Sequence, residues 1–408
     1  MSVPPCTDST PGMDSLELAM ASLPLPTLHA LLARAAPESP EEQHALRMLR
    51  DVLAQLPAPP KPVVGLDGAV YPCAWARDLA TEPLLQDDGH RYTLFPIRHP
   101  DVFQLYEELR DKFWFAGEIK LTRDREDYAK LDPNVRHWVD MTLAFFASSD
   151  GLVLHNLFDR IISAVKTPES RHFFGIQVGN ETIHSEMYSV LIEALVESAE
   201  RKAAMFNAVK ESRTIRRKAE WILAFINDRL NVSLGELFIA VACMEGIMFC
   251  SSFACIFNLR ERGLMPGLCN ANLMISGDEY KHMVNLLLHY ERKTVNKLSP
   301  DRVLEIVRSA VEVEHDFVNE SLPVPILGMS ADLMRSYVCY VANFAVSHLC
   351  GIPLPYPEQT ACPLVFMEHQ GRQVKTNFFE HRAVEYQRPA TQSPAAPRQL
   401  SIDTSRDF

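Results

Sequence analysis

The chain of 408 residues lacks the long apolar runs and the cysteine pairs that mark membrane-spanning and disulfide-framed proteins. It contains no uninterrupted apolar run of about eighteen residues, and no basic N-terminal region is followed by an apolar stretch and a cleavage site. Its nine cysteines form no CxxC pair, and several lie in apolar helical stretches where a reduced thiol behaves as a small hydrophobe. We therefore expect a globular protein of the cytoplasm, or of a host cytoplasm if the source is viral, with reduced thiols.

Positive charge is also in deficit, because 40 Lys and Arg face 52 Asp and Glu and the net charge is −12. A nucleic-acid surface needs the opposite sign. The one basic cluster, residues 210–218, is interrupted by Glu211 and by apolar residues, so we interpret it as a solvated helix face. We expect neither nucleic acid nor a membrane as a partner.

Composition divides the chain into four parts. Residues 1–90 form an extension rich in Pro and Ala, in which Ser39-Pro40-Glu41-Glu42 caps a predicted short amphipathic helix. That helix could dock on a partner, but packing back on its own domain is the favoured interpretation. Residues 91–355 are almost continuously helix-periodic, residues 356–386 form an extended C-terminal segment, and residues 387–408 are a flexible tail rich in Pro, Ser, Thr and Gln.

Proline and glycine place the ends of the long helices. Asp132-Pro133 opens a helix that runs to Asp150 and beyond, residues 262–267 break the helix that carries Glu245, and residues 321–325 break a later one. The predicted fold class is all-α, a bundle of long helices.

The most informative pattern is a doubled Glu-x-x-His motif. Positions i and i+3 share one helix face, so each motif places a carboxylate and an imidazole side by side. A lone acid precedes each motif, by 31 residues in the first case and 34 in the second, which fits one helix, a turn and half of the next helix. The candidate metal ligands are Asp150, Glu181, His184, Glu245, Glu279 and His282.

A single Glu-x-x-His is most often part of a solvated helix face, but two copies with matched upstream acids are hard to explain in that way. Four carboxylates and two imidazoles are the ligand set of dinuclear sites in ferritin-like bundles. Oxygen and imidazole donors without thiolate favour iron or manganese over copper(I) or structural zinc, and six ligands shared by two ions leave room for exogenous oxygen ligands.

Tyr188 follows Glu181 and His184 on the same helical stripe, at i+7 and i+4. Phe249 and Phe253 follow Glu245 at i+4 and i+8, and Ile275 precedes Glu279 by four residues. These side chains either line a dry pocket that would protect an oxidised phenol or are simply core, and periodicity does not separate the two.

Asp278 directly precedes Glu279, so it faces about 100° away around the helix. From there it could accept a hydrogen bond from the outer nitrogen of a ligand histidine. We therefore predict an orienting role for this carboxylate.

With these residues in place, the chain resembles the radical-bearing small subunit of class I ribonucleotide reductase, most closely the eukaryotic-type members. The resemblance covers residues from about 91 to 408. It is carried by Phe95-Pro-Ile97, Phe113-Trp114, Leu143-Ala-Phe-Phe-Ala-Ser-Ser-Asp150, Glu181-Thr-Ile-His-Ser-Glu-Met-Tyr188, Met244-Glu-Gly246, residues 262–268, Asp278-Glu279 with His282, Lys375-Thr-Asn-Phe-Phe379 and Glu385-Tyr386.

The resemblance implies a ferritin-like fold with a di-iron centre that uses O2 and an electron donor to oxidise Tyr188 to a stable radical. Asp150, Glu181 and His184 would hold one ion, and Glu245, Glu279 and His282 the other. Trp114, Asp278 and His184 match the residues proposed to carry an electron between the surface and the metals.

The resemblance also implies a homodimer that serves a large catalytic subunit, where ribonucleotides are reduced to deoxyribonucleotides. Tyr386 would pass the radical to that subunit, and the tail, with Ile402, Asp407 and Phe408, would dock on it. Two departures from the family pattern, Gly277 and Leu154-His155, spare all six candidate ligands.

Two other functional classes remain open. The first is a di-iron oxidase with its own substrate and Tyr188 as a spectator, which would not need Tyr386 and a flexible peptide after it. The second is non-enzymatic. An iron-storing bundle would usually be far shorter, and an inactive small subunit used to bind partners would be expected to have lost ligands.

Overall fold

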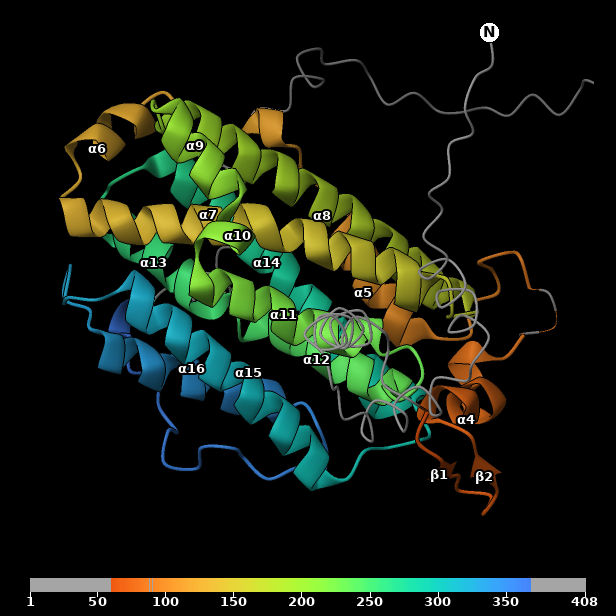
Figure 1. Cartoon of the computed structure of the whole chain (residues 1–408). Helices are drawn as coiled ribbons and strands as arrows, with labels where there is room; N and C mark the ends of the chain where they lie inside the picture. Colours follow the sequence, from red (N-terminus) through yellow and green to blue (C-terminus); the bar gives the residue numbers. More distant parts are fainter. Residues whose placement is uncertain (1–59, 88, 90, 368–408) are drawn as a thin grey trace, which may run out of the picture. The chain divides into compact units, whose positions relative to one another are not determined.

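The structure is a computed structural model that describes residues 60–87, 89 and 91–367, and within residues 150–159 only the backbone (Figure 1). The predicted amphipathic helix near residue 39 and the tail from residue 387 lie outside this range. Contacts divide the chain into two compact units, whose described parts are residues 60–78 with 227–233, and residues 79–226 with 234–367. The larger unit therefore begins before residue 91, where composition placed the change.

The prediction of an all-α fold is confirmed, since the described residues form long helices and one short strand pair. In the smaller unit, β1 and β2 pair antiparallel, Val63 with Tyr71 and Val64 with Val70. The elements are β1 (Val63–Val64), β2 (Val70–Tyr71), α4 (Ala74–Thr81), η1 (Pro83–Leu85), α5 (Pro100–Arg110), η2 (Ala116–Glu118), α6 (Asp124–Lys130), α7 (Pro133–Asn156), η3 (Leu157–Ile162), α8 (Pro168–Leu195), α9 (Ala199–Phe206), α10 (Ala208–Glu211), α11 (Arg213–Asn227), α12 (Leu234–Gly246), α13 (Cys250–Glu261), α14 (Pro266–Leu288), η4 (His289–Lys293), α15 (Pro300–Ser321) and α16 (Ala331–Val346).

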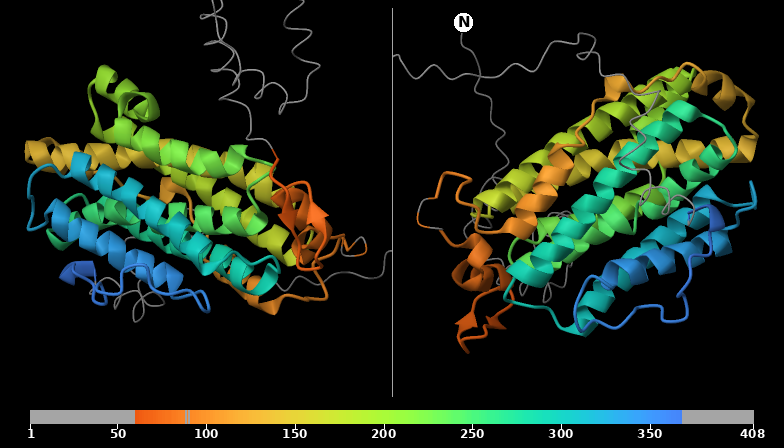
Figure 2. Two further views of the ribbon diagram at one scale, coloured as in Figure 1. Left: turned by 60° about the horizontal axis from the view of Figure 1, so that its bottom comes forward. Right: turned by 180° about the vertical axis from the view of Figure 1, so that it is seen from behind.

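Two helix pairs make the centre of the larger unit. Helix α7 packs along α8 and α12 packs along α14, while α8 also contacts α14 and α13 contacts α7. Figure 1 shows α7 and α8 side by side. Helices α15 and α16 pack together against α12, and Figure 2 shows them adjacent in both further views. Each of the two Glu-x-x-His motifs lies on one of these central helices, α8 or α14.

The start of α14 is fixed by a close approach to α6. Pro266 is its first residue, and Asp124 accepts hydrogen bonds from the amides of Gly267 and Leu268 at 3.0 and 2.7 Å. A Cβ at Gly267 would lie 2.4 Å from the carbonyl oxygen of Lys120, so only glycine fits. The predicted break at residues 262–267 is confirmed, because α13 ends at Glu261.

The helix that carries Glu245 is interrupted earlier than the sequence predicted, between Gly246 and Cys250. The amides of Ile247 and Met248 both donate to the carbonyl oxygen of Cys243, at 2.9 Å each, which widens the helix by one residue. Gly246 permits the close packing of α12 on α14, because a Cβ there would lie 2.2 Å from the sulfur of Met283.

The segment Leu234–Glu261 is long and apolar enough to suit a membrane span by composition alone. In the described fold, 94% of the most apolar 18-residue stretch of this segment is buried inside the bundle. A central core helix of a folded domain has the same composition, so this segment is weak evidence for a membrane.

The interpretation of residues 210–218 as a solvated face is wrong for Lys218, which is fully buried. Helix α11 turns Ile215, Ala219 and Ile222 inward, and Lys218 lies on this same buried face. Its ammonium contacts the equally buried Glu314 at 2.6 Å. Burial lowers the pKa of Lys218 and raises the pKa of Glu314, so desolvation opposes both charges and their contact compensates.

A second buried titratable group is His289, and we expect it to make stability depend on pH. Its Nδ1 bonds the carbonyl oxygen of Asn285 and its Nε2 bonds the hydroxyl of Ser170, both at 2.8 Å. Burial lowers the pKa of His289 to about 4. The unfolded chain, with a histidine pKa near 6.5, therefore binds more protons than the folded chain between those two values.

We predict that His289 alone removes about 2 kcal/mol of the free energy of unfolding between pH 7 and pH 5. The loss should level off below pH 4, where both states carry the proton. Denaturant unfolding of wild type and His289→Gln at both pH values measures it, because the variant cannot titrate at this position. Equal pH slopes for the two proteins would refute the assignment.

Candidate metal centre

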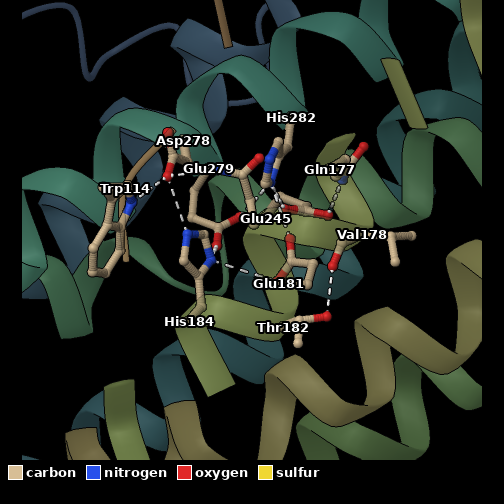
Figure 3. A network of polar contacts seen from close by, with 11 residues as sticks. Trp114, Gln177, Val178, Glu181, Thr182, His184, Glu245, Asp278, Glu279 and His282 are labelled. Carbon is tan, nitrogen blue, oxygen red and sulfur yellow. Dashed lines mark hydrogen bonds and ion pairs between the residues drawn. The ribbon is translucent and has the colours of Figure 1, made fainter. Parts of the chain in front are cut away.

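Five of the six predicted ligands lie together in the centre of the bundle (Figure 3). Glu181 and His184 come from α8, Glu245 from α12, and Glu279 and His282 from α14. All five are at most 1% exposed. The sixth, Asp150, lies in α7, but its side chain is not among those the structure describes.

Carboxylates surround the imidazole of His282. Its Nδ1 lies 3.0 Å from Glu181 Oε1, 3.2 Å from Glu245 Oε2 and 3.2 Å from Glu279 Oε2. One donor atom from each of these four residues lies within 4.8 Å of every other. His184 joins the group through Nδ1, which lies 2.9 Å from Glu279 Oε1. The arrangement supplies convergent oxygen and nitrogen atoms around a small volume.

Unmet polar atoms in this cluster fit a metal better than they fit a hydrogen-bond network. Neither oxygen of Glu181 makes a well-aligned hydrogen bond to another described residue, nor do Glu279 Oε1 and His184 Nδ1, although several of their contacts are short. Buried carboxylates without donors are costly unless a cation compensates them. Their mixed oxygen and imidazole chemistry suits iron or manganese and argues against a structural thiolate site.

Protons compete with a metal for these atoms. Burial raises the pKa of Glu245, and the charges of Glu279 and Glu181 raise it further. Burial opposes protonation of His184, but its contacts with the carboxylates of Asp278, Glu181 and Glu279 raise its pKa above the usual value. Metal binding therefore displaces protons from the cluster, and metal affinity should increase as pH rises.

Asp278 lies beside the cluster and accepts three hydrogen bonds on Oδ2. The donors are Trp114 Nε1 at 2.9 Å, Asn180 Nδ2 at 3.0 Å and His184 Nε2 at 3.2 Å. The hydrogen bond predicted between Asp278 and a ligand histidine is therefore present. The Trp114 ring also stacks on His184, with centroids 6.0 Å apart and planes 25° apart. An unbroken polar and aromatic path thus leads from Trp114 to the cluster.

Sequence reasoning missed two partners of the cluster, Gln177 and Asn180. Gln177 Nε2 donates to Glu245 Oε1 at 2.9 Å, and Asn180 donates to Asp278 as described. Each lies four residues before a predicted ligand on α8, so the helical period that placed Glu181 and His184 also identifies them. Both hold a carboxylate in a fixed orientation.

Tyr188 is 1% exposed and lies one helical turn after His184. Its ring stacks on Phe146, with centroids 4.6 Å apart and planes 11° apart. Phe249 and Phe253 pack on the same Phe146 ring at 5.4 and 5.0 Å, and Ile275 is fully buried. Phe146 was not among the predicted pocket residues, although its position four residues before Asp150 was a usable signal. The other predicted functional residues, Tyr386, Ile402, Asp407 and Phe408, lie outside the described part of the chain.

Comparison with known proteins assigns the family. A family model described as "Ribonucleotide reductase, small chain" matches residues 91–363. The ribonucleoside-diphosphate reductase small chain of Trypanosoma brucei brucei is 41% identical over 323 residues, which cover 79% of this chain and 94% of the relative. Subunit M2 of the human enzyme is 39% identical over 335 residues, covering 82% and 84%.

A solved structure gives the same assignment for the fold. The ribonucleotide reductase Rnr4 homodimer from Saccharomyces cerevisiae matches with a TM-score of 0.61 at 25% identity, covering 72% of this chain and 93% of that one. The ferritin-like architecture expected from the sequence is therefore confirmed. The chain belongs to the ribonucleotide reductase small chain family.

Proposed function

We propose that the buried cluster holds two iron ions and that Tyr188 is oxidised there to a stable radical. The chain is a ribonucleoside-diphosphate reductase small subunit. Membership of this family implies that it has a large-subunit partner and forms a homodimer. The radical would pass to that partner, which reduces ribonucleotides to deoxyribonucleotides. The observation that carries the proposal is the ring of Glu181, Glu245, Glu279 and His282 donor atoms within 4.8 Å of one another.

The metal ligands we propose are Asp150, Glu181 and His184 for one ion, and Glu245, Glu279 and His282 for the other. When bound, iron supplies the redox chemistry with dioxygen that no amino-acid side chain provides. The protein holds the ligand carboxylates in place, as Gln177 does for Glu245. Iron and manganese both suit the donor set, and metal analysis of the purified chain decides between them.

Tyr188 is suited to hold a long-lived radical because it is buried and packs on one ring of an aromatic cluster. The stacked Phe146, backed by Phe249 and Phe253, keeps water and reductants away from the phenol. A buried position also disfavours the charged cation radical that loss of an electron alone would leave, so the phenol proton would leave together with the electron. These are the physical requirements for a radical that outlasts its formation.

Trp114 and Asp278 would conduct the electron between the metal centre and the protein surface. Both are buried, and Asp278 links the indole N–H of Trp114 to the ring N–H of His184 through one oxygen atom. Fixed hydrogen bonds of this kind keep the redox groups at constant distance. Tyr386 would continue the path toward the large subunit, and we propose the cytoplasm as the place where the two subunits meet.

Metal titration tests the proposed centre directly. We expect the purified chain to bind close to two ferrous ions, and a chain in which Glu279 and His282 are both alanine to bind fewer. A storage bundle would take up many ions for each chain. An inactive subunit would bind none with comparable affinity, and either result would refute the dinuclear centre.

Removal of the residues after Gln387 tests docking separately from the metal centre. We predict that the truncated chain keeps its metals and the Tyr188 signal but loses nucleotide reduction with the large subunit, because the tail and its apolar end are gone. A synthetic peptide of residues 388–408 should inhibit the intact pair by competition. Full activity of the truncated chain with the large subunit would contradict the docking role.

A further inference from the structure

A buried ion pair outside the metal centre clamps the interruption between α12 and α13. Lys218 on α11 and Glu314 on α15 are both fully buried and lie 2.6 Å apart. Lys218 Nζ donates to the carbonyl oxygen of Met248 at 2.8 Å, inside the interruption. Glu314 accepts a hydrogen bond from the hydroxyl of Ser251, in the first turn of α13. Lys218 on α11 and Glu314 on α15 therefore both bond residues in or next to the interruption.

These bonds stabilise the interruption, where the backbone hydrogen bonding is irregular. The amides of Ile247 and Met248 both bond Cys243, so the regular ladder of the helix does not continue through this turn. A buried carbonyl without a partner is costly, and a buried ammonium is an unusually strong donor for it. Lys218 therefore replaces a missing backbone bond at this point of the helix.

Aromatic rings connect the same ammonium to the surroundings of Tyr188. Lys218 Nζ lies 3.5 Å from the ring centre of Phe145 and 3.7 Å from that of Phe317. Phe145 packs edge-on against Phe249 at 5.5 Å, and Phe249 packs against Phe146, which stacks on Tyr188. The clamp and Tyr188 are thus linked by a continuous series of ring contacts.

The position of the interruption gives it a functional meaning. Glu245, a candidate ligand, lies immediately before it, and Phe249 lies at its end. A shift of this turn would move the carboxylate relative to Glu279 and His282 and would move the ring relative to Phe146. A purely structural ion pair could lie anywhere in the core. This pair bonds the turn that joins Glu245 to Phe249.

We propose that Lys218 is a positioning residue, held by Glu314, that fixes the turn between α12 and α13 and so orients Glu245 for metal binding and Phe249 for protection of Tyr188. The second half of this inference rests on the proposed radical function. The first half rests only on metal binding.

The test uses the full-length chain with both charges removed, Lys218→Met with Glu314→Met, so that no unpaired charge remains buried. The matched control is Arg91→Met with Glu169→Met, another buried ion pair, at 2.9 Å, in which Glu169 lies in the first turn of α8 and also accepts hydrogen bonds from the amides of Arg98 and His99. Cobalt(II) binding is followed by visible absorption, the Tyr188 signal by electron paramagnetic resonance, and folding by circular dichroism and thermal unfolding.

We expect the clamp variant to bind at least one cobalt ion about tenfold more weakly and to lose the Tyr188 signal about tenfold faster. The control should lose thermal stability while its cobalt affinity and signal lifetime stay within about twofold of wild type. Cobalt affinity within about twofold of wild type in the clamp variant overturns the positioning of Glu245.

The two halves of the inference fail in distinguishable ways. If wild type shows no tyrosyl signal but the cobalt difference is present, the radical function fails and the positioning of Glu245 stands. If the clamp variant does not fold, Ser251→Ala tests the positioning of Glu245 instead. This substitution removes only the hydrogen bond from Ser251 to Glu314. It should weaken cobalt binding about threefold, and wild-type affinity would overturn the proposal.

Discussion

The Glu245→Gln variant should fold like wild type and yet bind metal at least about a hundredfold more weakly. Losing a metal ligand should weaken metal affinity more than losing a hydrogen-bond partner of that ligand. Burial and neighbouring carboxylates raise the pKa of Glu245, so a neutral amide of the same shape is expected to be tolerated in the metal-free fold. The amide oxygen can also keep the bond from Gln177, which is 2.9 Å long in the native site. Folding and metal binding are therefore separated by one substitution.

Two companion variants make this result specific. Glu236→Gln changes a carboxylate on the same helix that pairs with Arg302 at 2.8 Å, away from the cluster, and should leave metal affinity unchanged. Gln177→Leu removes only the hydrogen bond to Glu245 and should cost about tenfold in affinity. Isothermal titration with ferrous or cobalt ions measures all three, and wild-type affinity in Glu245→Gln would show that this carboxylate is not a ligand.

Trp114→Phe should lower the rate of nucleotide reduction with the large subunit about a thousandfold, while leaving the metals and the Tyr188 signal in place. The substitution removes the indole N–H that donates to Asp278 at 2.9 Å and the ring that stacks on His184. The phenyl ring fills most of the same buried space, so the fold should persist. Loss of turnover without loss of the radical would place Trp114 on the transfer path.

Trp138→Phe is the matched control, since Trp138 is also 1% exposed but lies on α7, away from Asp278. It should retain nucleotide reduction within about twofold. The two variants are compared by single-turnover assays with the large subunit and by electron paramagnetic resonance. Equal turnover in both would remove Trp114 from the path.

Helical periodicity predicted the cluster because its ligands are local in sequence. Glu181 with His184, and Glu279 with His282, meet at i and i+3 on α8 and α14, and the same arithmetic explains why Gln177 and Asn180 belong with them. The helix limits were equally readable, since Pro133, Pro266 and Pro300 each begin a helix. Local chemistry of this kind is written directly in the sequence.

The features that escaped prediction depend on contacts between distant segments. The interruption after Gly246 is specified by a carbonyl of Met248 that bonds Lys218, about thirty residues earlier in the chain. A lysine among arginines on α11 has the composition of a solvated face, and only its pairing with Glu314 allows it to be buried. The stacking of Phe146 on Tyr188 likewise needs the packing of α7 against α8.

The most direct measurement is the electron paramagnetic resonance spectrum of the chain after loading with ferrous iron and oxygen. A tyrosyl signal is expected in wild type, and Tyr188→Phe should lack it while retaining the optical bands of the iron centre. Phe keeps the ring stacked on Phe146, so the fold and the metals are preserved. Absence of the signal in wild type, or an identical spectrum from Tyr188→Phe, would contradict the account of this chain as a radical generator.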